Sequence, residues 1–194
     1  MPLIDMPLEK LRTYQGISPR PADFDAYWDR ALAEMNAVDP RVELIKAEFQ
    51  APHVECFELY YTWVRNARIH ARYARPKHAA KPGPALLQFH GYSHHALAWV
   101  EKLAYASSGI AIAGLDCRGQ GGMSEDVGGI KGNTLRGHII RGLNDDPDNL
   151  LFRHIYLDTA LLARIVASFE EVDPARMGRS EERRVGKECR ARWS

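Results

Sequence analysis

The stretch Gly109-Ile-Ala-Ile-Ala-Gly-Leu-Asp116 decides the fold class of this 194-residue chain. It is a short, uninterrupted apolar run, and such runs are typical of strands that are buried on both faces of a parallel sheet. A similar run, Pro84–His90, lies before it, and the sequence between them is helix-like at 98–107. Strand, helix and strand in this order predict two parallel strands joined by a crossover helix.

Two longer segments predict helices that cover this sheet. Asp23 can cap the first, which runs to about Asn36 with apolar residues at helical spacing. The second, 148–169, carries an apolar stripe and is stopped by Asp173-Pro174. Another strand is expected to begin at about Ala175.

Three strand-like runs lie between the first helix and the parallel unit. The turn between the last two contains Arg65 and Asn66, which favours a hairpin. An antiparallel start followed by alternating strands and helices predicts an α/β fold, a three-layer sandwich with a mixed, mostly parallel sheet and helices on both faces. We expect residues 1–178 to form one such domain, and its antiparallel runs are 42–49, 54–64 and 67–74.

Composition and charge narrow the class of protein. Hydrophobic residues make up 45% of the chain and charged residues 26%, as in a globular protein with one core. The formal net charge of +1 gives no electrostatic reason to expect nucleic acid or an anionic membrane as a partner. The three cysteines are too far apart for a metal or disulfide framework, and we recognise neither a signal sequence nor a membrane-spanning stretch. We therefore expect a cytoplasmic protein.

The last residues, 179–194, differ from the rest of the chain. They contain five Arg, one Lys and three Glu, and they show neither helical nor strand periodicity. The segment resembles the translation of a sequencing adapter, and a basic, solvated tail is the alternative. We expect it to be non-native, so that Cys189 and Trp193 carry no functional meaning.

The strongest chemical signal is Phe89-His-Gly-Tyr92, directly after a buried strand. Gly91 permits a sharp turn, after which the amide of Tyr92 points into a site. Fixed N–H dipoles of this kind stabilise the negative charge that develops on a carbonyl oxygen during acyl transfer. The alternative is an ordinary turn between a strand and a helix.

Two weaker signals lie beside this turn. Gly91-Tyr-Ser93-His-His95 nearly fits Gly-x-Ser-x-Gly, but its last position is His, so Ser93 is not expected to be a nucleophile. His90, His94 and His95 have no Cys or carboxylate partner at ligand spacing. We therefore expect no metal site.

The segment Asp116-Cys-Arg-Gly-Gln-Gly-Gly122 gives the second chemical signal. A dinucleotide-binding loop requires a third glycine and a following helix, and both are missing, so we expect no nucleotide and no other cofactor. Asp116 and Arg118 are expected to form a polar pair beneath the floor of a site. Gly119, Gln120 and the neighbouring His90 are expected to support the same site from behind.

Taken together, these motifs resemble the acetyl xylan esterase / cephalosporin C deacetylase family of α/β-hydrolases. The resemblance covers residues 1–178 with its motifs in the right order, and their joint occurrence is far more specific than any one of them. The segments that carry it are 6–14, 20–28, 90–92, 116–121, 132–142 and 153–159.

The resemblance implies an α/β-hydrolase fold and a serine carboxylesterase. Such an enzyme removes acetyl groups from acetylated xylo-oligosaccharides, cephalosporin C-type compounds and other small esters, with Ser as nucleophile, His as base and Asp orienting the His. Tyr92 matches the family residue that lines the acetyl pocket and donates its N–H to the oxyanion hole, with Gly91 before it. The resemblance also implies a homo-oligomer, assembled partly through the N-terminal arm and the hairpin.

The sequence departs from the family where the Gly-x-Ser-x-Gly turn should follow the strand near Met177. We expect the chain to stop before the catalytic Ser, Asp and His, to be inactive by itself, and to leave the strand 110–115 at an exposed edge. Two alternatives stay open. One is another α/β-hydrolase chemistry, such as that of a lipase, peptidase or dehalogenase, and the other is a non-catalytic carbohydrate-binding fragment, against which the long helix at 148–169 argues.

Overall fold

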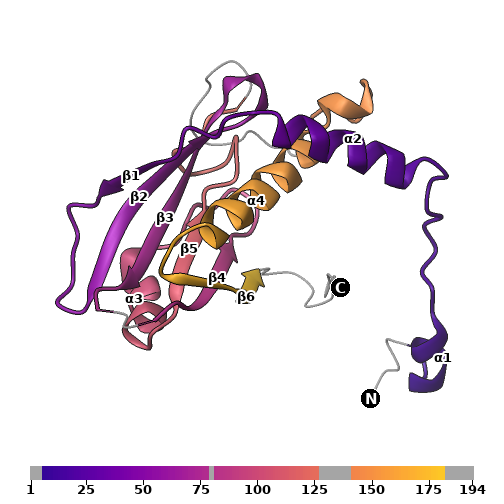
Figure 1. Ribbon diagram of the computed structural model, residues 1–194. Coiled ribbons are helices and arrows are strands. Elements are labelled where there is room, and N and C mark those ends of the chain that lie inside the picture. Colours follow the sequence, from indigo (N-terminus) through magenta and orange to yellow (C-terminus); the bar gives the residue numbers. More distant parts are fainter. Residues whose placement is uncertain (1–5, 79–80, 127–140, 182–194) are drawn as a thin grey trace.

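A computed structural model describes residues 6–78, 81–126 and 141–181. Within them, the centre of the molecule is a six-stranded sheet in the order β1-β2-β3-β5-β4-β6 (Figure 1). The strands are β1 (Glu43–Lys46), β2 (Val54–Thr62), β3 (Arg68–Pro76), β4 (Gly83–Phe89), β5 (Ala111–Leu115) and β6 (Val172–Glu181).

The sheet is mixed, as the sequence predicts. The pairings β1–β2, β2–β3 and β3–β5 are antiparallel, and β4 pairs in parallel with both β5 and β6. Among the described strands, antiparallel pairings therefore outnumber parallel ones. The predicted hairpin is confirmed, because β2 and β3 are joined at Arg65 and Asn66, whose φ values are 64° and 59°. Left-handed backbone at two successive positions suits the tight reversal of an antiparallel pair.

Helices cover both faces of the sheet, which gives the three layers. Alternation along β5 shows this directly: Ala111, Ala113 and Leu115 join one hydrophobic cluster, and Ile112 joins the other. The first cluster lies under the helices α2 and α4, and the second lies under α3 on the opposite face. All five residues of β5 are buried, as expected for an uninterrupted apolar strand. The helices are α2 (Phe24–Asn36), α3 (Trp99–Ser107) and α4 (Leu151–Ala167).

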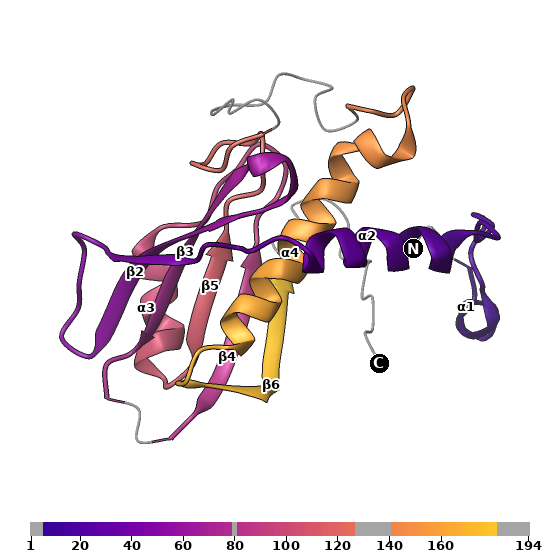
Figure 2. The same cartoon turned by 45° about the horizontal axis from the view of Figure 1, so that its top comes forward.

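The helix α4 crosses the sheet, and α2 packs against α4 (Figure 2). The apolar stripe of α4 is buried, and Arg153 of α4, also buried, donates to Glu34 of α2 over 2.6 Å. The expected cap of α2 is wrong in one respect, because the side chain of Asp23 makes no capping hydrogen bond. Its backbone, at φ −96° and ψ 9°, is not in the extended region from which a capping side chain reaches the first turn.

The strand 110–115 is not at an edge, contrary to the expectation. It corresponds to β5, which lies between β3 and β4. An apolar run reports that a strand is buried, but it does not report which strands flank it. The outer strand of the described sheet on this side is β6, which begins at Val172 and pairs with β4 as far as Glu181. Residues 182–194 lie outside the described residues, so a non-native tail at 179–194 stays a prediction, as does the domain boundary at 178.

Candidate active site

The candidate site is built by two loops at the carboxyl ends of β4 and β5. Phe89 and Leu115, the last residues of these strands, are register partners in the parallel sheet. His90 and Asp116 therefore leave the sheet side by side. Loops at the carboxyl ends of parallel strands are where open α/β sheets bind their ligands.

His90 joins the two loops through both ring nitrogens. The amide of Cys117 donates to Nε2 of His90 over 2.9 Å, and Nδ1 lies 2.7 Å from the carbonyl oxygen of Gly91. An amide only donates and a carbonyl only accepts, so the ring is neutral with its proton on Nδ1. Burial lowers the pKa of His90, which favours the same neutral form. His90 thus holds the start of the turn through these two contacts.

The turn itself runs from Gly91 to His94. The amide of His94 donates to the carbonyl of Gly91 over 3.2 Å, and Ser93 has a φ of 61°. Tyr92 is 46% exposed, so a small molecule could reach it. Ser93 does not sit at a strand-to-helix turn, because α3 begins only at Trp99.

The glycine-rich loop after β5 interlocks with this turn. The carbonyl of Gln120's side chain accepts the amide of Ser93 over 2.5 Å, and the amide of Gly121 donates to the carbonyl of His94 over 2.9 Å. A Cβ atom on Gly121 would lie 2.8 Å from the carbonyl oxygen of Ser93, so the close approach itself requires glycine. Of the three glycines at 119, 121 and 122 in this loop, Gly119 alone has a positive φ, of 64°.

Asp116 connects the two loops by hydrogen bonds. Its carboxylate accepts the amide of Ala96 from the first loop and the amide of Met123, at 2.8 Å, from the second. Nδ1 of His70 lies 2.6 Å from Oδ2 of Asp116. Burial by itself raises the pKa of Asp116, but the hydrogen bonds from His70, Ala96 and Met123 outweigh it and lower the pKa to about 2.

The expected pair between Asp116 and Arg118 is wrong. Arg118 turns to the other side and forms two hydrogen bonds of 2.7 and 2.6 Å with Asp158 of α4. Both side chains are fully buried, and the guanidinium lies 5.0 Å from the centre of the Trp63 ring. Residues two positions apart in a loop leave it in different directions, so spacing alone could not assign the partners. Arg118 therefore fixes α4 to the loop and does not contact Asp116.

Sequence reasoning missed the partners of Asp116 and Arg118. His70 and Glu58 lie on β3 and β2, and Asp158 lies on α4. The only signal for Asp158 was its place in one of the family-like segments. His70 and Glu58 gave none, since a polar residue in a half-buried strand is ordinary until the register is known. The family-like segment 132–142 lies largely outside the described residues.

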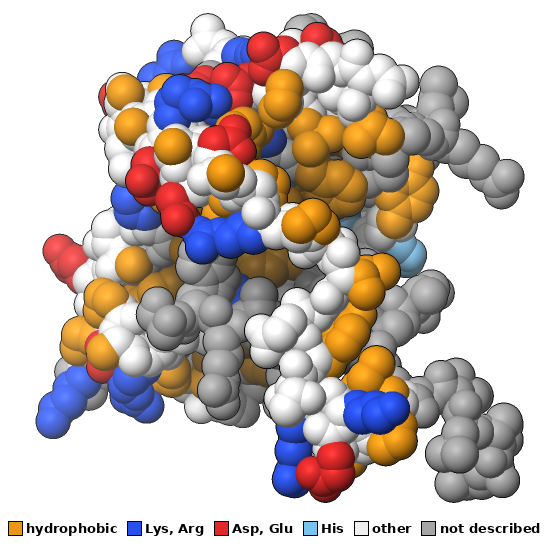
Figure 3. Space-filling view, turned by 90° about the vertical axis from the view of Figure 1, so that its right-hand side faces the viewer, with side chains coloured by type: hydrophobic (Ala, Val, Ile, Leu, Met, Phe, Trp, Pro, Cys, Tyr) orange, Lys and Arg blue, Asp and Glu red, His pale blue; other side chains and the backbone are white. Residues whose placement is uncertain are grey.

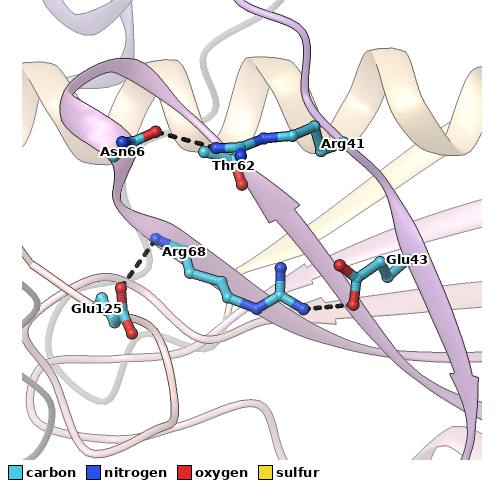
Figure 4. Close-up of a pocket in the computed structure, with 6 residues that line it drawn as sticks. All are labelled: Arg41, Glu43, Thr62, Asn66, Arg68 and Glu125. Carbon is cyan, nitrogen blue, oxygen red and sulfur yellow. Dashed lines mark hydrogen bonds and ion pairs between the residues drawn. The ribbon is translucent and has the colours of Figure 1, made fainter.

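A polar pocket of about 230 Å³ lies where β2 ends and β3 begins (Figure 4). Inside it, Arg68 donates to Glu43 over 2.6 Å and Arg41 donates to Asn66 over 2.9 Å. It contains none of the predicted site residues. Its lining is Arg41, Glu43, Thr62, Asn66, Arg68 and Glu125.

In the part of the chain that the structure describes, no group of three or more His, Cys, Asp or Glu side chains is placed to hold a metal ion. Among the same residues, no helix has both the length and the apolar character needed to span a membrane.

A mixed sheet with a His-Gly turn and an Asp-x-Arg-Gly loop at the carboxyl ends of adjacent parallel strands defines an α/β-hydrolase. The family model for acetyl xylan esterase (AXE1) matches residues 1–183, so the chain belongs to the acetyl xylan esterase family. The resemblance drawn from the sequence motifs is thus confirmed.

Solved structures agree with this assignment. The chain matches acetyl xylan esterase 1 from Thermoanaerobacterium sp. JW/SL YS485 with 56% identity and a TM-score of 0.83, covering 91% of this chain and 56% of that one. It also matches an acetyl xylan esterase from Paenibacillus sp. R4 with 30% identity and a TM-score of 0.79, at the same coverages of 91% and 56%. The chain therefore spans little more than half the length of these two structures.

Proposed function

We propose that this chain is part of a serine carboxylesterase that removes acetyl groups from acetylated xylo-oligosaccharides and other small esters. In this proposal the chain supplies part of the sheet and one donor of the oxyanion hole. The observation that carries the proposal is the turn Gly91-Tyr92, held by His90 at the end of β4 in a chain that is 56% identical to an acetyl xylan esterase. The proposal gives the amide of Tyr92 the role of an oxyanion donor.

The chemistry needs a fixed donor at this place. When a serine attacks an acetyl ester, the carbonyl oxygen becomes an oxyanion, and a preorganised N–H stabilises it without rearranging. The turn that carries Tyr92 is fixed from three sides: by His90, by Gln120 through Ser93, and by Asp116 through Ala96. A backbone held in this way supports a donor that does not move during the reaction.

The proposal places the nucleophile after β6. No Gly-x-Ser-x-Gly motif occurs in the 194 residues, so the catalytic Ser, Asp and His are proposed to lie outside them. The position of β6 supports this, because it pairs with β4 in parallel. A turn that follows β6 comes out at the same end of the sheet as Tyr92.

A chimera tests the proposal. Residues 1–178 are joined to the part of the Thermoanaerobacterium sp. esterase that follows the equivalent of Gly178, and hydrolysis of p-nitrophenyl acetate and acetylated xylo-oligosaccharides is measured. We expect hydrolysis that disappears when the nucleophile Ser is replaced by Ala. A chimera that folds, as judged by circular dichroism, but is no faster than its Ser→Ala control contradicts the proposal.

We propose a preference for acetate over longer acyl groups, with cephalosporin C among the accepted esters. Rates on p-nitrophenyl acetate, butyrate and octanoate separate this from a lipase-like enzyme, which favours the longer chains. Deacetylation of cephalosporin C is measured as the release of acetate. Binding of xylo-oligosaccharides without hydrolysis would favour the carbohydrate-binding alternative.

We also propose that the protein is a cytoplasmic homo-oligomer. The N-terminal arm supports an oligomer, because α1 (Leu8–Thr13) has no buried residue and the arm extends away from the sheet (Figure 1). Hydrophobic side chains line this arm (Figure 3), and Ile17 is 89% exposed. Light scattering of the protein with and without residues 6–20 tests the oligomer. Cell fractionation tests the location, for which the free, buried thiols of Cys56 and Cys117 are the support.

A further inference from the structure

His70 on β3 lies between two carboxylates. Nδ1 is 2.6 Å from Oδ2 of Asp116, and Nε2 is 2.6 Å from Oε2 of Glu58. The His70 side chain is 1% exposed. An ionised carboxylate only accepts hydrogen bonds, so satisfying both contacts requires a proton on each ring nitrogen, which makes the ring an imidazolium. Burial lowers the pKa of His70, but the hydrogen bonds that its ring donates to the two carboxylates more than compensate and raise the pKa.

The backbone around His70 is joined to the same loop. The amide of Asp116 donates to the carbonyl of His70 over 3.0 Å. The hydroxyl of Ser124 accepts the amide of His70 over 2.8 Å and lies 2.5 Å from the carbonyl oxygen of Asp116. His70 and Asp116 are therefore connected three times, once through side chains and twice through the main chain or Ser124.

Other charged groups face this cluster from each neighbouring element. Arg72 of β3 lies 3.8 Å from Glu58. Lys102 of α3 is fully buried, interacts electrostatically with Asp116 and Glu58, and lies 3.2 Å from the carbonyl oxygen of Leu97. The remaining neighbours are the Tyr60 ring, 4.9 Å from the His70 ring, Arg68 over that ring, and His90, which senses the charge of Asp116.

We propose that His70, held in turn by Glu58, is a positioning residue for the turn Gly91–His94, which contains the proposed oxyanion donor Tyr92. It orients the carboxylate of Asp116, which holds the amides of Ala96 and Met123 and thereby both loops of the site. The proposal rests on the proposed function, because the oxyanion role of Tyr92 is part of it. In this proposal His70 acts on the turn through Asp116.

The geometry of the cluster separates positioning from simple packing. His70 and Asp116 are buried and Glu58 is partly exposed, so the three charges lose hydration that an apolar cluster of the same shape would not lose, and they gain little for stability alone. The cluster fixes the orientation of the Asp116 carboxylate. An imidazolium N–H holds one oxygen of Asp116 and leaves the other to accept the amide of Ala96.

Two matched variants test the proposal. In His70→Asn the side-chain amide nitrogen replaces Nδ1, so the donor to Asp116 is kept and the donor to Glu58 is lost. In His70→Gln the amide nitrogen replaces Nε2, and the reverse holds. Both variants remove the imidazolium and the same ring packing. A purely structural His70 therefore predicts equal effects, whereas a positioning His70 predicts that His70→Gln is the worse of the two.

The readouts do not all depend on activity. In the 194-residue chain, long-range ¹H–¹⁵N spectra should show both nitrogens of His70 protonated at pH 7. Hydrogen exchange of the Ala96 and Met123 amides should speed up at least about tenfold in His70→Gln and by less than about threefold in His70→Asn. Should the 194-residue chain give no dispersed spectrum, the chimera provides the same amides.

Activity then links positioning to catalysis. In the chimera, His70→Gln should lower kcat at least about tenfold with little change in KM, and His70→Asn should retain most of kcat. A singly protonated His70, or equal exchange and equal rates in the two variants, overturns the proposal. A chimera without any esterase activity overturns the proposed function instead, and the exchange data still decide whether His70 positions Asp116.

Discussion

The amide of Cys117 donates a 2.9 Å hydrogen bond to Nε2 of His90, so the loop after β5 holds the residue that precedes the turn Gly91–His94. The contact joins positions 27 residues apart in sequence but adjacent at the ends of two parallel strands. It also requires a neutral ring, because a protonated Nε2 could not accept the amide.

Replacement of His90 tests this contact. His90→Phe should destabilise the protein by about 1–3 kcal/mol, because the buried amide of Cys117 loses its acceptor. His90→Gln should cost less, since its amide oxygen can occupy the place of Nε2. Urea unfolding of the two variants measures the difference. Equal costs for Phe and Gln would show that the hydrogen bond contributes nothing beyond packing.

His154 should make the protein sensitive to acid. Burial, followed by the charge of Arg118, lowers the pKa of His154 to about 4. The unfolded chain therefore binds a proton that the folded chain excludes, so stability is complete above the ordinary pKa of about 6.5 and falls as the pH drops towards 4. Between pH 7 and 4.5 we expect a loss of about 2–3 kcal/mol from this residue.

The control for this pH effect is His154→Gln. Its amide nitrogen can keep the 3.0 Å hydrogen bond that Nε2 makes to the carbonyl of Asp148, but it cannot titrate. Urea unfolding at both pH values should show a smaller loss in this variant. The remainder should include His90, whose pKa is shifted in the same direction. An identical loss in wild type and variant would assign the acid sensitivity to other groups.

Gly122 should tolerate no side chain. A Cβ atom there would lie 2.0 Å from Cγ of Asp116, whose carboxylate is held in place by three hydrogen bonds. We expect Gly122→Ala to cost about 3 kcal/mol. Gly109→Ala is the matched control, because its φ is 87° but nothing lies within 4 Å of the new atom. It should cost about 1 kcal/mol, from backbone strain alone. Thermal unfolding that ranks Gly109→Ala as equal or worse would refute the close approach.

The ion pair of Arg118 and Asp158 should be costly to break from either side. Asp158→Ala leaves a buried guanidinium without its partner and should destabilise the protein by about 3–5 kcal/mol. The double variant Arg118→Met with Asp158→Leu removes both charges and should be clearly more stable than Asp158→Ala. A double variant no better than the single one would mean that packing, and not the uncompensated charge, decides the cost.

The sequence was sufficient for the strands and helices around the site and for their layers, but not for the short helix α1 in the N-terminal arm. Apolar runs at 84–90 and 109–116 predicted buried strands, and the stripe at 148–169 predicted the helix that covers them; the structure has β4, β5 and α4 there. These patterns are local, because burial on one or both faces leaves a period of 2 or 3.6 residues in the chain.

Pairings between distant residues could not be predicted in the same way. His70 and Asp116 are 46 positions apart, and Arg118 and Asp158 are 40 apart, so neither pair follows from spacing. The position of β5 between β3 and β4 likewise depends on how the chain crosses the sheet. The Asp116–Arg118 pair was a wrong prediction for this reason: neighbours in sequence were paired, although the fold supplies each with a more distant partner.

The most direct test of the central claim removes a single N–H group. Tyr92→Pro deletes the backbone amide assigned to the oxyanion, whereas Tyr92→Ala deletes the ring and keeps the amide. We predict that Tyr92→Pro lowers kcat of the chimera on p-nitrophenyl acetate at least about a hundredfold below Tyr92→Ala, while circular dichroism shows both folded. Equal rates for the two folded variants would contradict the assignment of the oxyanion donor to Tyr92.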